Sequence, residues 1–217
     1  MKNAARPLLL ALALATLPTL ALADGLQALE AFLRQVQSGQ ARFTQTVTAP
    51  ERDGQPARVT RSSGDFAFER PGKFRFDYRK PFPQQIVGDG KTLWVYDEGL
   101  NQATSRNQQQ ALDETPAAIL SSARTRAELE KTFQLQNAPE ADGLQWVIAT
   151  PKTSDGALRS VRIGFKDNTL AALDIEDNFA QHSALRFENF AVNPTIPPAT
   201  FRFTPPKDAD VIQDQQP

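Results

Sequence analysis

The chain has 217 residues, with 24 Lys and Arg against 25 Asp and Glu and a formal net charge of −1 at pH 7. This balance is typical of a globular protein and lacks the basic excess that non-specific nucleic-acid binding requires. The absence of Cys excludes disulfides, thiol nucleophiles, thiolate zinc sites and lipid-modified Cys anchors, and a single His182 excludes sites that need two imidazoles. The chain has 14 Phe but only two Tyr and two Trp, which favours an apolar region with few hydrogen-bonding groups.

The N-terminal segment, residues 1–23, has the pattern of a secretory signal peptide. Two basic residues precede an apolar stretch at 8–20, and residues 21–23 fit a small-x-small cleavage site. A membrane anchor needs about 20 apolar residues, which is longer than this stretch. Asp24 stands where a bacterial lipoprotein would carry Cys. We therefore expect a cleaved signal peptide, a single domain over residues 24–217, and an exported product without a lipid anchor.

A helix and then a strand are predicted at the start of the remaining chain. Apolar residues including Leu29 and Leu33 recur at helical spacing between Gly25 and Ser38. The pattern then changes to a period of two over residues 41–48, which predicts a half-exposed strand that includes Phe43.

Residues 63–78 predict two antiparallel strands with one apolar face. The aromatic side chains of this segment are Phe66, Phe68, Phe74, Phe76 and Tyr78. A two-residue loop would divide them between the two faces of the sheet, whereas a loop of three or five residues keeps them together. A loop at residues 71–73, for example, would pair Phe68 with Phe76. The same alternation places Arg70 on the apolar side.

The rest of the chain predicts further strands and two short helices. Strands are expected at residues 84–87, 91–96, 102–105, 133–137, 144–150, 158–165, 170–175, 184–192 and 201–204. Thr115 begins a helix that continues to residue 123, and Thr125 with Glu128 forms a capping box for a helix at 126–132. About ten strands and three helices favour a mainly β (α+β) fold in which an antiparallel sheet curls around the helices.

The sequence offers little support for catalysis. Acidic clusters such as Asp97-Glu98 lie beside turn signals, which favours solvated charges over a paired acid and base. His182 has no accompanying nucleophile motif, and residues 208–210 lack the Gly and Glu of a calcium loop. We expect no catalytic residue, no metal and no cofactor.

Arg70 allows two interpretations. It lies at the rim of the sheet and points to water, or it faces a pocket and donates its five hydrogen bonds to backbone carbonyls or a ligand. Phe residues would suit a cavity for acyl chains, because they supply area without hydrogen-bond demands. The helices could equally fill the same space.

Several segments, in order along the chain, resemble the periplasmic outer-membrane lipoprotein carrier (LolA) family. These segments are Ala41–Val47, Phe68–Pro71 with Phe74, Asp89–Tyr96, Gln102–Thr104, Glu114–Pro116 and Phe201–Pro206. The resemblance implies an unclosed antiparallel β-barrel, or half-barrel, covered by a lid of about three short helices over a hydrophobic cavity.

The resemblance also implies a function and a set of site residues. The protein would be a monomer that receives the acyl chains of lipoproteins from an inner-membrane ATP-driven releasing complex and passes them to the outer-membrane receptor LolB. Arg70 would bind the lid backbone as a latch, and Phe74 would take part in accepting and releasing cargo. The expected cavity and cargo-binding residues are Phe74, Phe43, Phe66, Phe68, Phe76, Leu29, Leu33, Trp94 and Trp146.

Two other functions compete with this one. A lipoprotein-sensing interaction module of the same fold usually carries a second domain, for which this chain lacks space. A periplasmic hydrolase that uses an acidic pair is the third possibility, and Asp97 with Glu98 is its best candidate.

Overall fold

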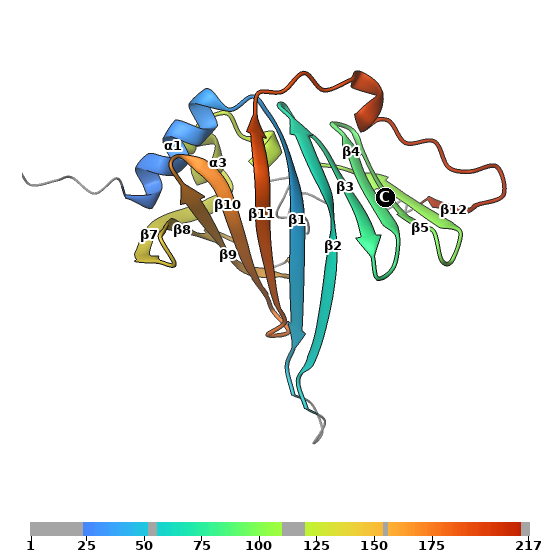
Figure 1. Ribbon diagram of the computed structural model, residues 1–217, viewed down its shortest axis with the longest axis horizontal. Coiled ribbons are helices and arrows are strands. Elements are labelled where there is room, and N and C mark those ends of the chain that lie inside the picture. The colour runs from blue at the N-terminus through green and yellow to red at the C-terminus, as the bar shows by residue number, and fades with distance from the viewer. Residues whose placement is uncertain (1–23, 52–55, 110–119, 154–155, 214–217) are drawn as a thin grey trace, which may run out of the picture.

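The computed structural model describes residues 24–51, 56–109, 120–153 and 156–213. A long, curved sheet dominates it, with helices gathered toward one end (Figure 1). The elements in chain order are α1 (Gly25–Gln35), β1 (Ser38–Ala49), β2 (Arg58–Glu69), β3 (Lys73–Lys80), β4 (Gln84–Asp89), β5 (Thr92–Asp97), β6 (Gln102–Asn107), α3 (Arg126–Thr132), β7 (Phe133–Ala141), β8 (Leu144–Pro151), β9 (Leu158–Lys166), β10 (Thr169–Asp177), β11 (His182–Val192), the 3₁₀ helix η2 (Pro198–Phe201) and β12 (Asp210–Gln213).

The twelve strands form one open sheet in the order β12-β6-β5-β4-β3-β2-β1-β11-β10-β9-β8-β7. Every neighbouring pair is antiparallel except β12 with β6, which is parallel. The two edge strands, β12 and β7, do not pair with each other, so the sheet does not close into a barrel. This arrangement confirms the predicted unclosed, mainly antiparallel fold with a few short helices.

The first helix is shorter than its apolar pattern predicts. Asp24 begins it by accepting a hydrogen bond from the backbone N–H of Gln27 at 2.8 Å. It ends at Gln35 rather than near Ser38, because Val36 is already extended and Ser38 pairs with Glu69 in the sheet. Strand pairing therefore takes the last residues of the predicted helix.

The β2–β3 hairpin confirms the predicted odd loop but corrects its position. The loop is Arg70–Gly72, and Glu69 pairs with Lys73 across it. Phe68 therefore faces Phe74, not Phe76. Gly72 has a φ of +74°, a left-handed conformation that glycine adopts without strain, and the loop lies one residue earlier than in the example given above.

The C-terminal region differs from the prediction. Residues 201–204 form no strand; Phe201 ends η2, whose first residue is Pro198. The exposed segment Asp210–Gln213, which includes Val211 and Ile212, forms β12 and lengthens the sheet by pairing with β6. Residues 120–122 are helical, as expected, while the predicted start of that helix at Thr115 lies outside the described residues.

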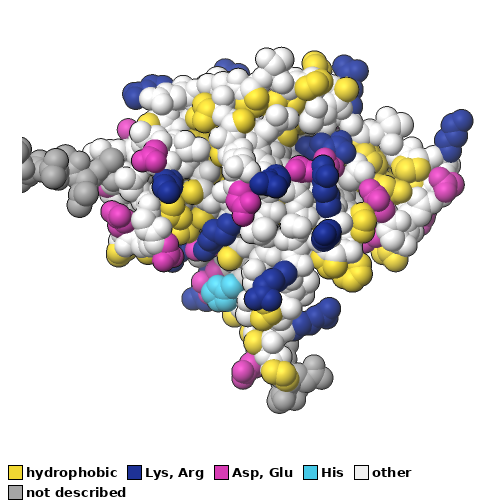
Figure 2. Space-filling model, in the orientation of Figure 1, with side chains coloured by type: hydrophobic (Ala, Val, Ile, Leu, Met, Phe, Trp, Pro, Cys, Tyr) yellow, Lys and Arg dark blue, Asp and Glu magenta, His cyan; other side chains and the backbone are white. Residues whose placement is uncertain are grey.

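The sheet has an inner face, covered by α1, and an outer face. The main apolar core lies on the inner face, where strand residues pack with Leu29 and Leu33 of α1. The outer face carries Lys, Arg, Asp and Glu side chains interspersed across the sheet (Figure 2). No helix within the described ranges is both long enough and apolar enough to cross a membrane.

Candidate functional site: an apolar face closed by a buried arginine

Five phenylalanines from three adjacent strands form a cluster on the inner face. This Phe cluster consists of Phe43, Phe66, Phe68, Phe74 and Phe76, each no more than 5% exposed. The rings of Phe66 and Phe76 are 4.5 Å apart between centroids, and those of Phe43 and Phe76 are 5.3 Å apart in an edge-on arrangement. Strand alternation accounts for the grouping, because every second residue of β2 and β3 points to the same face. The structure thus brings together the five predicted phenylalanines.

Helix α1 covers part of this face. Leu29 and Leu33 are 0% and 1% exposed and belong to the same buried core as the Phe cluster. The ring of Phe32 lies 6.2 Å from that of Phe68 and 5.6 Å from that of Phe165. Leu29 and Leu33 therefore lie where the sequence places them, and Phe32 joins them as an additional contact.

Arg70 is buried at the edge of the Phe cluster and bonds to the lid segment, residues 120–123. Its Nε donates to the carbonyl oxygen of Ala123 and its Nη2 to that of Leu120, both at 2.8 Å. The guanidinium lies 5.2 Å from the ring centroids of both Phe32 and Phe68. This geometry excludes the solvent-facing interpretation of Arg70.

Burial makes the charged form of Arg70 less stable than it would be in water. Desolvation lowers the pKa of the guanidinium to about 10, which still leaves it protonated at neutral pH. Its Nη1 is buried and has no hydrogen-bond partner among the described residues. A cation held by two neutral carbonyls in an apolar setting is only partly compensated, so the closed contact carries a cost as well as a gain.

A second contact joins the same turn to the lid. The backbone N–H of Gly72 donates to the carbonyl oxygen of Ser121 at 2.8 Å. The loop Arg70–Gly72, named the latch turn below, therefore binds three carbonyl oxygens of the lid segment, those of Leu120, Ser121 and Ala123. The structure shows residues 120–122 of this segment as helical, and the predicted helix start at Thr115 lies outside the described residues.

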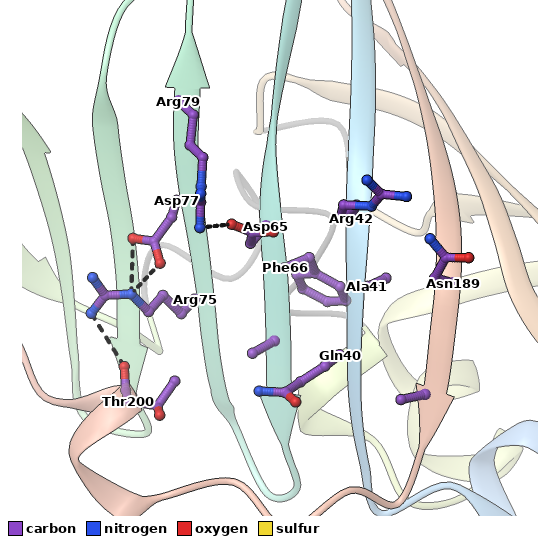
Figure 3. Close-up of a pocket in the computed structure, with 12 residues that line it drawn as sticks. Gln40, Ala41, Arg42, Asp65, Phe66, Arg75, Asp77, Arg79, Asn189 and Thr200 are labelled. Carbon is purple, nitrogen blue, oxygen red and sulfur yellow. Dashed lines mark hydrogen bonds and ion pairs between the residues drawn. The ribbon is translucent and has the colours of Figure 1, made fainter.

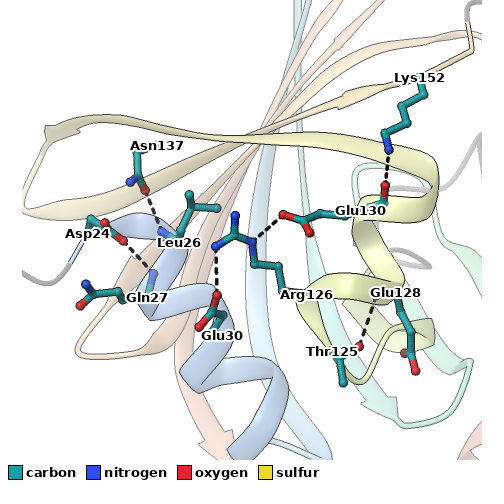
Figure 4. A network of polar contacts seen from close by, with 10 residues as sticks. All are labelled: Asp24, Leu26, Gln27, Glu30, Thr125, Arg126, Glu128, Glu130, Asn137 and Lys152. Atoms are coloured by element: carbon teal, nitrogen blue, oxygen red, sulfur yellow. Dashed lines mark hydrogen bonds and ion pairs between the residues drawn. The ribbon is translucent and has the colours of Figure 1, made fainter.

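The lid segment leads directly into α3, which is tied to α1 by charged side chains (Figure 4). Arg126 donates to Glu30 at 3.0 Å and to Glu130 at 2.6 Å. The predicted capping box is present, since Thr125 Oγ1 accepts from the N–H of Glu128 at 3.2 Å. The two helices are thus connected to each other at the surface of the molecule, beside the buried core.

Trp94 and Trp146 lie apart from the Phe cluster. Leu93 is in the inner core, so its neighbour Trp94 points to the outer face, where its ring is 5.5 Å from that of Phe203. Trp146 likewise precedes the inner-core residue Val147, and the guanidinium of Arg162 lies 4.8 Å from its ring. Alternation along β5 and β8 therefore places both tryptophans on the opposite face from the other predicted site residues.

The outer face holds a groove of about 490 Å³ between β1, β2, β3 and η2 (Figure 3). Charged pairs dominate it: Arg75 bonds Asp77 at 2.7 Å, and Arg79 pairs with Asp65. Arg75 also donates to the carbonyl oxygen of Thr200 at 3.2 Å, which holds the C-terminal segment against the sheet. These residues neutralise one another and suit a structural role better than the binding of an apolar ligand.

The candidate catalytic and metal-binding groups are dispersed. Asp97 accepts a hydrogen bond from the N–H of Leu100 within the β5–β6 turn, and His182 is exposed. The described residues contain no group of three or more His, Cys, Asp or Glu side chains placed to hold a metal ion.

One buried side chain beside the latch turn, Gln108, was not predicted from the sequence. It stands in a run of polar residues, which is typical of a loop.

Residues 34–204 match the model of the family described as "Outer membrane lipoprotein carrier protein LolA". The chain belongs to the outer-membrane lipoprotein carrier family. Three relatives, each named outer-membrane lipoprotein carrier protein, cover most of it. The protein of Albidiferax ferrireducens is 52% identical, covering 89% of this chain and 93% of its own; that of Leptothrix cholodnii is 50% identical, covering 88% and 86%. That of Dechloromonas aromatica is 42% identical, covering 97% and 98%.

Among solved structures, a LolA-superfamily protein from Nitrosomonas europaea aligns with a TM-score of 0.48 at 11% identity, covering 83% of this chain and 98% of its own. The membership in a carrier family rests on the sequence relatives rather than on this alignment.

Proposed function

We propose that this protein is a periplasmic carrier that shields the acyl chains of lipoproteins and delivers them to the outer membrane. The observation that carries the proposal is the latch: Arg70 binds the lid carbonyls of Leu120 and Ala123 at the edge of the buried Phe cluster. The Phe side chains offer apolar area without hydrogen-bond demands, and the lid can be released by breaking a few bonds. Family membership supports lipoproteins as the cargo.

The chemistry of the cargo defines what the carrier must do. A triacyl anchor has on the order of 40 buried methylenes, so its extraction from a bilayer costs roughly 30 kcal/mol at about 0.8 kcal/mol each. Neither the composition nor the described residues supply a nucleotide-binding motif or a metal site. In this proposal an ATP-driven inner-membrane complex supplies the extraction energy, and the carrier shields the acyl chains and then releases them.

The latch explains release as well as closure. In the empty protein, Arg70 and the N–H of Gly72 donate hydrogen bonds to carbonyl oxygens of the lid segment. These bonds break when acyl chains enter between the lid and the sheet. Remaking these bonds favours the empty state, by about 0.5–3 kcal/mol per bond, and so helps transfer to the receptor LolB. The carrier works as a monomer, because one chain supplies the face, the lid and the latch.

Residues 1–23 direct export as a cleaved signal peptide in this proposal, consistent with their basic, apolar and small-residue pattern. The chain in the periplasm would then begin at Asp24, the residue that caps the N-terminus of α1.

A release assay tests the proposed function. Purified protein from residue 24 onward is added to spheroplasts that synthesise a labelled outer-membrane lipoprotein, and the soluble fraction is probed for a one-to-one complex. We expect the lipoprotein to appear in solution with the wild-type protein and not with serum albumin at the same concentration. Lipoprotein that stays entirely in the membrane fraction would rule out the carrier function.

A further inference from the structure

The buried polar side chains of the described residues all occur at one place. They are Arg70, Gln108 and Ser121, which are 7%, 4% and 0% exposed. Arg70 and the backbone of Ser121 belong to the latch described above, whereas Gln108 lies just beyond the end of β6. A buried amide is costly unless it is hydrogen-bonded, so its partners indicate what it holds in place.

Gln108 connects two turns to the end of a strand. Its Nε2 donates to the carbonyl oxygen of Gly72 at 2.6 Å, and its Oε1 accepts from the N–H of Gly90 at 2.9 Å. Its own backbone N–H donates to the carbonyl oxygen of Lys91 at 2.8 Å. The side chain therefore joins the latch turn to the β4–β5 turn, and the backbone N–H joins the β4–β5 turn to the end of β6.

The bond to Gly72 bears directly on the latch. The N–H of Gly72 donates to Ser121 in the lid, while the carbonyl of the same residue accepts from Gln108. Gly72 has a φ of +74° and no side chain to fix its position, so these two bonds orient it from opposite sides. Rotation of this residue would withdraw one lid bond and displace the backbone that carries Arg70, two residues earlier.

The surroundings of Gln108 are shaped to receive it. A Cβ added at Gly88 would lie 2.8 Å from Gln108 Oε1 and 2.5 Å from the ring of Phe74. Gly88 thus leaves room for both the amide and a member of the Phe cluster.

We propose that Gln108 is a positioning residue of the latch, which holds the latch turn in the orientation from which Gly72 and Arg70 reach the lid. It acts through those residues and does not itself touch the lid carbonyls. Its loss loosens closure selectively, without weakening the rest of the sheet. The inference deepens the proposed carrier function, on which its biological meaning rests.

Amide hydrogen exchange on the empty protein tests this role. Gln108→Glu keeps the length of the side chain but replaces the N–H₂ donor with an oxygen that repels the Gly72 carbonyl. Gln109→Glu is the matched control, because Gln109 is the next residue and is exposed. We expect exchange at the Gly72 N–H and across residues 120–123 to be about 10-fold faster in Gln108→Glu, with amides of β10 and β11 unchanged and with Gln109→Glu like the wild type.

Three results would overturn the inference. The first is that amide exchange in the lid segment of Gln108→Glu equals that of the wild type. The second is that exchange in β10 and β11 increases as much as exchange in the lid segment, which would indicate general destabilisation. The third is an effect of Gln108→Glu that is as large in an Arg70→Leu background as in the wild type, because two of the three lid bonds that Gln108 would position are then already absent. Gln108→Asn, one methylene shorter with the same groups, serves if Gln108→Glu does not fold and should show the same pattern.

This measurement stands apart from the proposed function. The exchange rates require no cargo, so a positioning role for Gln108 can be confirmed even if the spheroplast assay shows no released lipoprotein. If the assay succeeds and the exchange pattern is absent, the carrier function stands and only the role of Gln108 is wrong.

Discussion

Arg70 combines an unfavourable burial with favourable bonds, and this combination suits a contact that must break. Burial lowers its pKa to about 10, and its Nη1 has no partner among the described residues. Against this, two hydrogen bonds and two nearby aromatic rings stabilise the closed position. A neutral side chain of similar size would lose the bonds and leave two lid carbonyls without donors. The residue therefore sets the balance between the empty and the loaded protein.

Arg70→Leu is expected to keep the fold but retain cargo. The loss of two bonds that form only in the closed state, each about 0.5–3 kcal/mol, removes part of the drive to expel acyl chains. Transfer of bound lipoprotein to a LolB-type receptor should fall about 10-fold or more, as measured by the fraction of labelled lipoprotein moved to receptor at a fixed time. Arg126→Leu is the control, since Arg126 bonds two glutamates on the surface. Equal transfer by wild type and Arg70→Leu would contradict the latch.

Tyr78 makes stability sensitive to alkaline pH. It packs against the Phe cluster, 5.0 Å from the ring of Phe43, and burial raises the pKa of its hydroxyl to about 12. Below the unfolded pKa near 10 the neutral form suits both states; as pH rises toward 12, the unfolded chain releases this proton first and becomes favoured.

The free energy of unfolding should therefore fall between pH 10 and 12, by about 1 kcal/mol at pH 11 from this group. Urea unfolding of the wild type and of Tyr78→Phe at pH 8 and pH 11 measures the effect. We expect the wild type to lose more stability than Tyr78→Phe over this range. An identical loss in both proteins would show that the partial burial of Tyr78 does not raise the pKa of its hydroxyl.

At the scale of elements, alternation was readable from the sequence and contacts between elements were not. The period of two in β2 and β3 predicts the Phe cluster, an odd loop and an inward Arg70, because side-chain direction depends only on parity. The pairing of Phe68 with Phe74 depends on the position of the turn at Gly72. Alternation alone allows Phe68 to pair with either Phe74 or Phe76, because both lie on the same face. The sequence also did not predict which face of the sheet Trp94 and Trp146 occupy, because this depends on whether they or their neighbours Leu93 and Val147 join the inner core.

The missed elements share a similar cause. β12 is four residues long and exposed at every position, and its two apolar residues, Val211 and Ile212, are adjacent, so the segment lacks the alternating pattern of a strand and is recognisable only by its pairing with β6. Residues 201–204 have strand-like Phe alternation, but Phe201 ends a helix that begins with Pro198 and packs on the outer face. In both places the tertiary partner decides the local structure.

Gly64 is a test of how β2 and β3 approach each other. A Cβ at this position would lie 1.9 Å from the carbonyl oxygen of Asp77, at a point where the register between the two strands shifts. Gly64→Ala should lower the free energy of unfolding by about 2–4 kcal/mol, because backbone rather than a mobile side chain must move. Gly99→Ala, where the near atom is the Asp97 side chain at 3.3 Å, is the control and should cost about 1 kcal/mol or less. Equal denaturation midpoints in urea for both variants would show that the strands are not this close.

For the whole molecule, one sheet separates two environments. Its inner face is apolar and closed by α1, the lid segment and the latch turn, while its outer face is charged and holds the C-terminal segment (Figures 1 and 2). The lid segment is held to the sheet by the hydrogen bonds of Arg70 and Gly72 and takes no part in strand pairing, so its movement would break these bonds and leave the strand ladders intact. This division allows the protein to remain folded while the space between lid and sheet changes.

Site-specific photo-crosslinking tests the central claim, that acyl chains occupy the inner face beneath the lid. A photoreactive phenylalanine analogue replaces Phe43 on the inner face in one protein and Trp94 on the outer face in another. Each protein is loaded with a lipoprotein whose acyl chains are labelled and is then irradiated. We predict a crosslink to the labelled chains from position 43 and none from position 94. Crosslinking from position 94 alone would contradict the account and place the cargo on the charged outer face.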